Sequence, residues 1–282
     1  DQIGLLRTDQ LGALKNAQLV AVSTAGIVGL TSQQIVSLKT TQLVALTTSQ
    51  IKAMEDQDVG ALGTAQLSRL TTLQVGALGA SQVDAFDSGE IKVLGTVQIS
   101  AISTAGITGL ASEDMQALST TQIGAFRTNQ VSTLSGDQIS SLNTSQVSIL
   151  STAQIVALSV DGISGLTSDD IVNLRAAQEA ALTTAQIAAL SIDQLSALTT
   201  QQISFLSSLQ LNALSIDQLN SLSTQDIVAL TTGQIAALSN NLFGALTNDQ
   251  LSSLTGQQIG ALTTAQFAQL TPDQFGTFTV NQ

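Results

Sequence analysis

The feature that most constrains this chain is an apolar residue at every eighth position, with no insertion or deletion along 282 residues. This series, the anchor positions, runs from Leu6 through Leu190 to Phe278, and nearly all of its members are Leu. A second apolar series lies three residues before the anchors, as at Ile187, and its one polar member is Glu179. Such a short and strict period predicts a repeat architecture, because a single unit cannot bury its apolar face alone.

The spacing of three within each unit decides between helix and strand. On a strand, residues three apart point to opposite faces, whereas on a helix they share one face. One continuous helix is excluded as well, because eight residues turn through about 800° and the apolar stripe would drift by about 80° per unit. The pattern therefore predicts short helices that restart in every unit. A β-solenoid is the alternative, favoured by the Thr content but opposed by this spacing and by the Gln, Ala and Leu enrichment.

The polar residues between anchors indicate where each helix begins. In the unit 182–190, LTTAQIAAL, Thr183 and Gln186 have the spacing of a capping box. Pro272 directly follows the corresponding Thr271, at the first helical position that proline favours. Most acids lie two or three residues after the cap and five of the eight bases directly follow an anchor, as the helix dipole favours. We predict an all-α solenoid, or superhelix, of about 35 helices of six or seven residues, with some segments of 3₁₀ type.

We expect residues 1–282 to form a single continuous repeat array, a fragment or processed part of a longer repeat protein, because the chain begins and ends inside the pattern. No polar capping repeat of the kind that keeps solenoids monomeric is present, so we expect self-association, end to end or lateral. Asp recurs at the third helical position at residues 58, 114, 170 and 226, always 56 apart. We interpret this as duplication of a seven-unit block, or as alignment of these units along one side of the superhelix.

Composition excludes several classes of function. The net charge of −12, without a cluster of Lys and Arg, argues against nucleic acid and anionic membranes as partners. No apolar run reaches the about 18 residues of a membrane span. The chain has no His and no Cys, on which most catalytic and haem chemistry depends, and its strict register leaves no room for an active-site loop. We predict neither an enzyme nor a bound cofactor.

Paired acids are the first group of candidate site residues. Calcium takes oxygen ligands, although acids at helix starts are also explained by the helix dipole and no DxDxDG loop is present. These calcium candidates are Asp56, Asp58, Glu113, Asp114, Asp169 and Asp170.

Apolar residues at positions that should face water form the second group. Single exposed apolar residues are common on protein surfaces, and the alternative is that they make contacts between molecules. These candidate assembly contacts are Leu73, Val97, Val160, Ile192, Leu209 and Ile216. Near the C-terminal end, Phe275 and Phe278 either close the core or join one molecule to the next.

The segment 168–182 departs from the pattern in two places. Glu179 replaces a core residue, and Arg175 stands where Ser or Thr usually caps the helix. We predict that two units fuse here into one longer helix in which Arg175 and Glu179 pair across one turn. This departure from the pattern is interpreted either as tolerated local repacking or as a hinge or a contact with a partner.

The units LTTAQIAAL and LSTAQIVAL resemble the long LTTxQIxAL-type octapeptide repeat tracts of large secreted or surface adhesin-like proteins of Gram-negative bacteria. The resemblance covers essentially the whole chain and carries over no catalytic or binding residue. It implies an extracellular or cell-surface protein with a fibre-like or adhesive role. We expect a structural protein that serves as filament subunit, stalk or biofilm matrix spacer. The alternative is an adhesin that binds a cell-surface or glycan partner through Ser/Thr/Gln-rich faces.

Overall fold

The computed structural model describes residues 2–279. Within this range the chain forms 34 short α-helices and a 3₁₀-helix at Ile3–Leu5, and it contains no strand. The all-α prediction is therefore confirmed, and the β-solenoid alternative is wrong. The α-helices are four to six residues long, slightly shorter than expected.

The chain divides into two compact units, Asp1–Leu150 and Ser151–Gln282, and the eight-residue register passes through this boundary unchanged. The helices of the first unit are α1 (Thr8–Ala13), α2 (Asn16–Val20), α3 (Thr24–Val28), α4 (Ser32–Ser37), α5 (Thr40–Ala45), α6 (Thr48–Ala53), α7 (Asp56–Val59), α8 (Thr64–Leu67), α9 (Thr72–Ala77), α10 (Ala80–Asp84), α11 (Ser88–Lys92), α12 (Thr96–Ala101), α13 (Thr104–Ile107), α14 (Ser112–Ala117), α15 (Thr120–Gly124), α16 (Thr128–Val131), α17 (Gly136–Ser140) and α18 (Thr144–Ser148). The helices of the second unit are α19 (Thr152–Ala157), α20 (Val160–Ser164), α21 (Ser168–Val172), α22 (Ala176–Ala181), α23 (Thr184–Ala189), α24 (Ile192–Ala197), α25 (Thr200–Phe205), α26 (Ser208–Leu211), α27 (Ile216–Asn220), α28 (Thr224–Ala229), α29 (Thr232–Ala237), α30 (Asn240–Gly244), α31 (Asn248–Ser253), α32 (Gly256–Gly260), α33 (Thr264–Phe267) and α34 (Pro272–Phe275).

Most of the described helices begin at the predicted capping box, and α3, α7, α13, α20 and α30 begin without the complete box. In α23 the Gln186 backbone N–H donates to Thr183 Oγ1 at 3.2 Å, and the Thr183 N–H donates to Gln186 Oε1 at 2.9 Å. These two bonds satisfy backbone donors that have no partner inside the helix. The same arrangement precedes α34, where Pro272 occupies the first helical position behind the cap Thr271.

Each helix ends without a left-handed residue. No residue in the range 2–279 has a positive φ. Instead the anchor closes the last turn, as when the Leu190 N–H donates to the Ile187 carbonyl at 3.2 Å, a bond of 3₁₀ type. Leu190 and the next cap, Ser191, are both extended (φ −61°, ψ 136° and φ −68°, ψ 162°). Two extended residues therefore separate successive helices, and the early closure explains why the helices are short.

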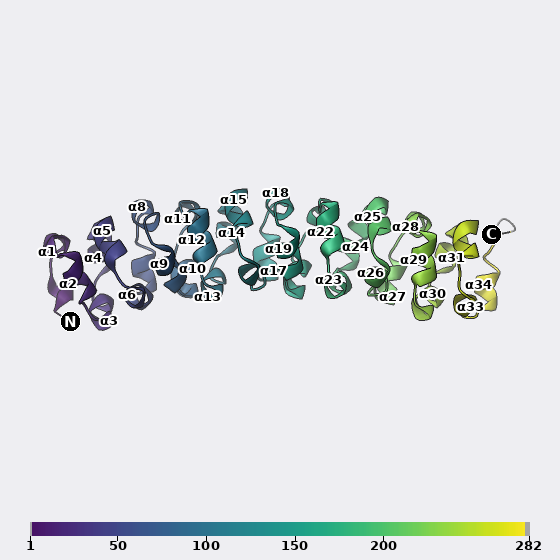
Figure 1. The fold of residues 1–282 in the computed structure, drawn as a ribbon, viewed down its shortest axis with the longest axis horizontal. Helices are drawn as coiled ribbons and strands as arrows, with labels where there is room; N and C mark the ends of the chain where they lie inside the picture. Colours follow the sequence, from purple (N-terminus) through teal and green to yellow (C-terminus); the bar gives the residue numbers. More distant parts are fainter. Residues whose placement is uncertain (1, 280–282) are drawn as a thin grey trace. The chain divides into compact units, whose positions relative to one another are not determined.

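Stacking of helices three apart builds the core of each unit. In the first unit α1 packs on α4 and α9 packs on α12, and in the second unit α21 packs on α24 (Figure 1). The two apolar series fill the space between the stacked helices; Ile187 is fully buried and Leu190 is 4% exposed. The core predicted from the spacing of three is confirmed.

A ladder of Gln side chains joins helices that are four apart, a contact that the eight-residue pattern alone does not predict. While Gln186 Oε1 serves the capping box, its Nε2 donates to the carbonyls of Ile155 at 2.8 Å and Leu158 at 2.9 Å, at the end of α19. Gln74 reaches the carbonyls of Leu43 and Leu46 in the same way. The side-chain oxygen of each such Gln accepts from a backbone N–H at the start of its own helix. The side-chain nitrogen donates to backbone carbonyls at the end of the helix four positions earlier.

One superhelical turn therefore takes between three and four units, because each helix packs on the helix three positions away and the Gln ladder joins helices four positions apart. In Figure 1 the labels α5, α8, α11, α15 and α18 follow one edge of the first unit, and α3, α6, α10 and α13 follow the other. Helices seven apart, such as α8 and α15, lie at the same edge and correspond to two turns. In the first unit, Asp58 and Asp114 are seven helices apart, which favours the interpretation that these units align along one side.

The prediction of a fused helix between residues 168 and 182 is wrong. Helix α21 ends at Val172 and α22 begins at Ala176, with the cap residue Arg175 in extended conformation. Arg175 lacks a capping oxygen, but its backbone N–H donates to Gln178 Oε1 at 2.8 Å. The backbone half of the capping box is therefore sufficient to restart a helix. Glu179 points into the core instead of pairing with Arg175 along the helix surface.

Candidate functional site

The structure separates the two members of each predicted calcium pair. Asp56, Glu113 and Asp169 are exposed at the first or second helical position. Their partners at the third position, in contrast, are buried and occupy the place of the ladder Gln; Asp58, Asp114 and Asp170 are between 1% and 3% exposed. Because one carboxylate faces solvent and the other faces the neighbouring turn, the members of a pair do not converge on a common point.

The buried aspartates have partners for part of their oxygen atoms. Asp170 Oδ2 accepts from the backbone N–H and the hydroxyl of Thr167, at 3.0 and 2.6 Å, and Asp58 Oδ1 accepts from the Ser32 hydroxyl at 2.7 Å. Burial raises the pKa of Asp58 and of Asp114, and hydrogen bonds from Ser32 and from the Ala111 backbone oppose this rise. Unlike Gln, a carboxylate cannot donate to the carbonyls of the preceding turn.

Two of these carboxylates keep an unpaired oxygen. Asp58 Oδ2 and Asp170 Oδ1 are buried and have no hydrogen-bond partner among the described residues. Residues 2–279 contain no group of three or more His, Cys, Asp or Glu side chains that could hold a metal ion. The calcium site stays a prediction from the sequence, and the arrangement of these six acids does not favour it.

Glu179 is the acid of the described chain whose pKa is raised furthest from its ordinary value. It occupies a core position on α22, is 2% exposed, and its Oε1 has no hydrogen-bond partner. Burial raises the pKa of Glu179 to about 7, and the nearby Gln202 amide opposes this rise. The residue borders a surface hollow that is also lined by Val172 and by the exposed ring of Phe205. Its carboxyl group is therefore close to the surface without being solvated.

The predicted assembly contacts lie at helix starts. All six helix-start residues occupy the first or second helical position, and their exposed fractions range from 41% to 76%; they are Leu73, Val97, Val160, Ile192, Leu209 and Ile216. The position explains the exposure, because the first two positions of these helices face solvent whereas the third is buried. Whether another molecule covers these side chains stays a prediction.

The aromatic residues at the C-terminal end contact one another. The ring of Phe275 lies 6.0 Å from that of Phe267 and 6.2 Å from that of Phe278, the latter in edge-to-face geometry. Phe275 is 45% exposed, whereas Phe243 is fully buried. The cluster partly shields the last described helices, and both predicted roles, closing the core and joining molecules, stay open.

Exposed apolar residues also occur at positions outside the predicted assembly contacts. Val28, Val36 and Val44 occupy the fifth position of their helices, and Phe205 stands where most units have Ala. Most units have a small residue at these positions, so a larger apolar residue there could have indicated these exposed side chains from the sequence.

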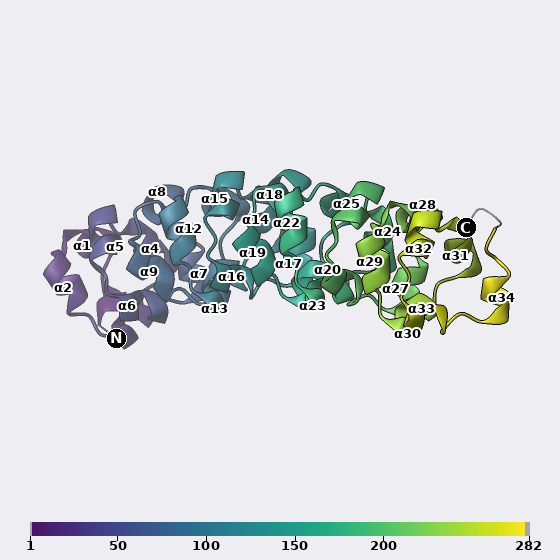
Figure 2. The same ribbon diagram turned by 45° about the vertical axis from the view of Figure 1, so that its right-hand side comes forward.

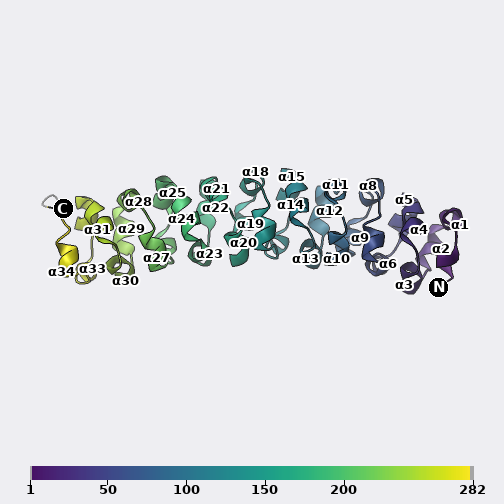
Figure 3. The ribbon, with the colours of Figure 1, turned by 180° about the vertical axis from the view of Figure 1, so that it is seen from behind.

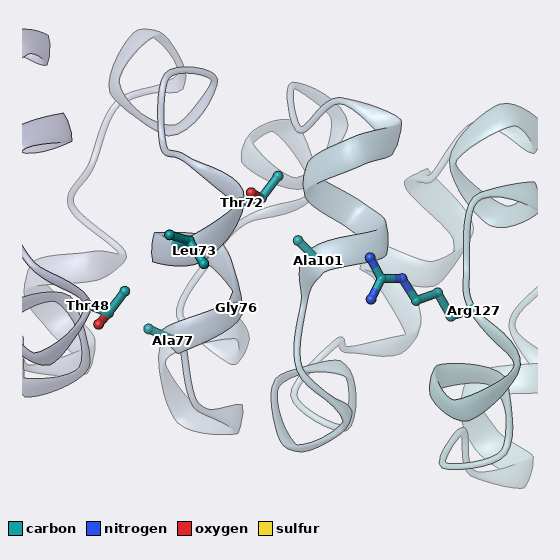
Figure 4. Close-up of a pocket in the computed structure, with 7 residues that line it drawn as sticks. All are labelled: Thr48, Thr72, Leu73, Gly76, Ala77, Ala101 and Arg127. Atoms are coloured by element: carbon teal, nitrogen blue, oxygen red, sulfur yellow. The ribbon is translucent and has the colours of Figure 1, made fainter.

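A shallow hollow lies beside Leu73 in the first unit. It is lined by Thr48, Thr72, Leu73, Gly76, Ala77, Ala101 and Arg127. Figure 4 shows the Arg127 guanidinium extended toward Ala101, across the space between neighbouring turns. An apolar side chain and a cation therefore flank the same surface.

Comparison with known proteins identifies the repeat. The family model described as the ALTTAQ repeat matches residues 13–48, 51–88, 107–144, 163–200 and 206–240, well over half of the chain. The chain belongs to the ALTTAQ repeat family. Three of the five ALTTAQ matches begin 56 residues apart, the same period as the Asp series. A search of curated proteins finds no match. No helix of the described ALTTAQ chain is long and apolar enough to cross a membrane.

Proposed function

We propose that the protein is a structural, self-associating extracellular scaffold that serves as filament subunit, stalk or matrix spacer. One observation carries the proposal: the same contacts recur from unit to unit. Gln186 joins α23 to α19 as Gln74 joins α9 to α5. A chain built in this way gains length with each unit, because every new unit contacts only its neighbours in the preceding turn.

The use of the polar groups supports a structural rather than a catalytic role. The Gln amides and the hydroxyls of Ser and Thr satisfy helix ends, and the buried Asp residues replace Gln in the same positions. Exposed Leu and Val side chains at helix starts offer surfaces for contact with further copies.

The proposed location outside the cell is supported by the resemblance of the LTTAQIAAL units to repeat tracts of secreted and surface proteins. The chain also contains no Cys, so its fold is independent of the redox state of its surroundings. A fibre or matrix component would benefit from this independence.

Electron microscopy and sedimentation velocity of the purified chain over a range of concentrations test the proposal. We expect elongated assemblies whose average mass grows with concentration. Monodisperse single chains at the highest attainable concentration would overturn self-association. Immunogold labelling of intact and permeabilised cells tests the location, and label that is confined to permeabilised cells would contradict the extracellular role.

An adhesin is the second candidate, and the exposed hydroxyl residues favour it. Thr and Ser occupy many cap and first helical positions that face solvent, such as Thr263 and Thr264. Within the predicted Ser/Thr/Gln faces, the ladder Gln side chains are buried against the preceding turn, and Gln186 is 3% exposed. Other Gln side chains, such as Gln257, are exposed. A glycan array combined with a cell-adhesion assay separates an adhesin, which binds in both, from an inert scaffold.

A further inference from the structure

Four helix starts of the first unit form a row with one member per superhelical turn. Helices α5 and α9 are joined by the ladder bonds of Gln74, α9 packs on α12, and the ladder bonds of Gln130 join α12 to α16. Figure 2 labels the four helices in this order along the unit. The row therefore connects neighbouring turns on one side.

We call this row the basic row and define it by Lys39, Leu73, Val97 and Arg127. Lys39 and Arg127 are the cap residues of α5 and α16, and both are exposed. Between them, Leu73 and Val97 are 75% and 66% exposed at the second position of α9 and α12. No described carboxylate forms an ion pair with either cation. The row presents two apolar side chains between two cations.

Four helix starts of the second unit form a row with the opposite charge. Ladder bonds of Gln194 join α20 to α24, α24 packs on α27, and ladder bonds of Gln250 join α27 to α31. Figure 3 labels these four helices in the same order along their unit.

We call this second row the acidic row; it is defined by Asp161, Asp193, Asp217 and Asp249, together with Val160, Ile192 and Ile216. Each Asp is exposed at the second helical position. The three apolar residues directly precede the first three Asp residues and are between 41% and 53% exposed. No base occurs at the cap, first or second positions of these four helices.

The two rows match in spacing as well as in charge. From start to end, both advance by four, three and four helices, because both follow the same superhelical winding. Superposed in either direction, the terminal cations Lys39 and Arg127 meet the terminal Asp161 and Asp249, and the central Leu73 and Val97 meet Ile192 and Ile216. Packed helices are about 8–10 Å apart, so side chains on successive turns of one row reach successive turns of the other.

We propose that the basic row of one copy binds the acidic row of a second copy, with ion pairs at both ends and apolar contacts in the middle. This inference rests on the proposed self-association and names the surfaces responsible. The contact is heterologous, because it joins two different surfaces: the basic row of one copy and the acidic row of the other. Two copies joined by one such contact still have one basic row and one acidic row unpaired between them, so further copies can add.

Charge reversal of each row, followed by mixing, tests the pairing. The basic-row variant carries Lys39→Glu with Arg127→Glu, and the acidic-row variant carries Asp161→Lys with Asp249→Lys. We expect each variant alone to need an about tenfold or higher concentration for half-association than wild type, because like charges then face each other. Mixed in equal amounts, the two variants should associate again, since each row then meets an opposite charge on the other variant.

Matched controls keep the test specific. Lys52→Glu with Lys92→Glu reverses two exposed bases outside the row and should associate as wild type does. Leu73→Asp with Val97→Asp should weaken association, whereas Leu209→Asp, at an equally exposed helix start outside both rows, should not. Circular dichroism of every variant shows whether its helices are retained.

The outcomes separate this inference from the proposed function. If wild type associates and the row variants associate equally well, the row pairing is overturned and self-association stands. If the charge-reversed variants fail alone and also fail when mixed, the pairing is likewise overturned. If wild type remains monomeric at every concentration, both fail. Binding of heparin by a monomeric wild type, lost in the basic-row variant, would assign the basic row to an anionic partner instead.

Discussion

Glu179 makes the stability of the second unit depend on pH. It is the one ionisable residue in the apolar series three residues before the anchors, and burial raises its pKa to about 7 from an ordinary value of 4.5. Helix α22 packs on α19 and α25, and neither of these helices carries a charged residue. The charged form of Glu179 therefore has no countercharge on the helices packed against it.

The sign and size of the effect follow from the proton balance. Between pH 4.5 and 7 the folded chain holds the Glu179 proton and the unfolded chain does not, so stability falls as pH rises through this window. Below about pH 4.5 the full stability is present, and the loss levels off above about pH 8. At about 1.4 kcal/mol per pKa unit, the loss is roughly 3.5 kcal/mol.

Amide hydrogen exchange of α19, α22 and α25, corrected for the intrinsic pH dependence, measures this loss locally. A local readout is needed because repeat proteins unfold segment by segment rather than in one transition. We expect the free energy of opening at α22 to fall between pH 4.5 and 8 in wild type and to stay nearly constant in Glu179→Gln, which keeps the shape without the titration. Glu113→Gln, which removes an exposed acid of α14, should behave as wild type.

Two results would refute the reasoning. Equal pH dependence in wild type and Glu179→Gln would show that the carboxyl group of Glu179 is not the titrating group. A rise in stability with pH at α22 would show that the charged form is the one favoured by the fold. Glu179→Leu adds a separate check, since it should stabilise α22 more at pH 8 than at pH 4.5.

Three further predictions test the ladder and the packing between turns. Gln186→Ala should cost about 2–3 kcal/mol, because both a capping acceptor and an inter-turn donor are lost, whereas the exposed Gln257→Ala should cost below about 0.5 kcal/mol by urea unfolding. Asp58→Gln should raise the melting temperature, because an amide replaces the unpaired Oδ2 and donates to the preceding turn; an unchanged or lower value would contradict this. Gly109→Ala should destabilise the first unit, because the added Cβ would meet the Ala80 carbonyl. Gly12→Ala, with nothing within 4 Å of the added Cβ, should stabilise it by about 0.5–1 kcal/mol.

The local features of the unit could be predicted because their causes lie within eight residues. The capping box of Thr183 and Gln186, the burial of Ile187 and Leu190, and the placement of Pro272 each depend on residues three or four apart. Such short-range relations can be read directly from a sequence pattern. The fused helix was predicted wrongly because Arg175 lacks a capping side chain, while its backbone N–H finds Gln178 regardless.

The candidate site could be predicted only in part. Exposure of Leu73 and Ile192 follows from their helical position, which the period gives. Their membership of two matched rows does not, because it depends on which turns lie side by side. The divergence of Asp169 and Asp170 has the same origin: the third helical position faces the preceding turn, and the second faces solvent.

The sequence by itself determined the unit, that is, where a helix starts, which residues are buried and where the helix stops. It also contained a 56-residue period whose meaning was open. Only the tertiary structure decided that helices pack three apart while Gln amides span four, so that seven units correspond to two turns. The physical reason is the separation of the contacting residues along the chain. The contacts between turns join residues 28 to 31 apart, and they depend on how the turns wind, which no periodicity within eight residues specifies.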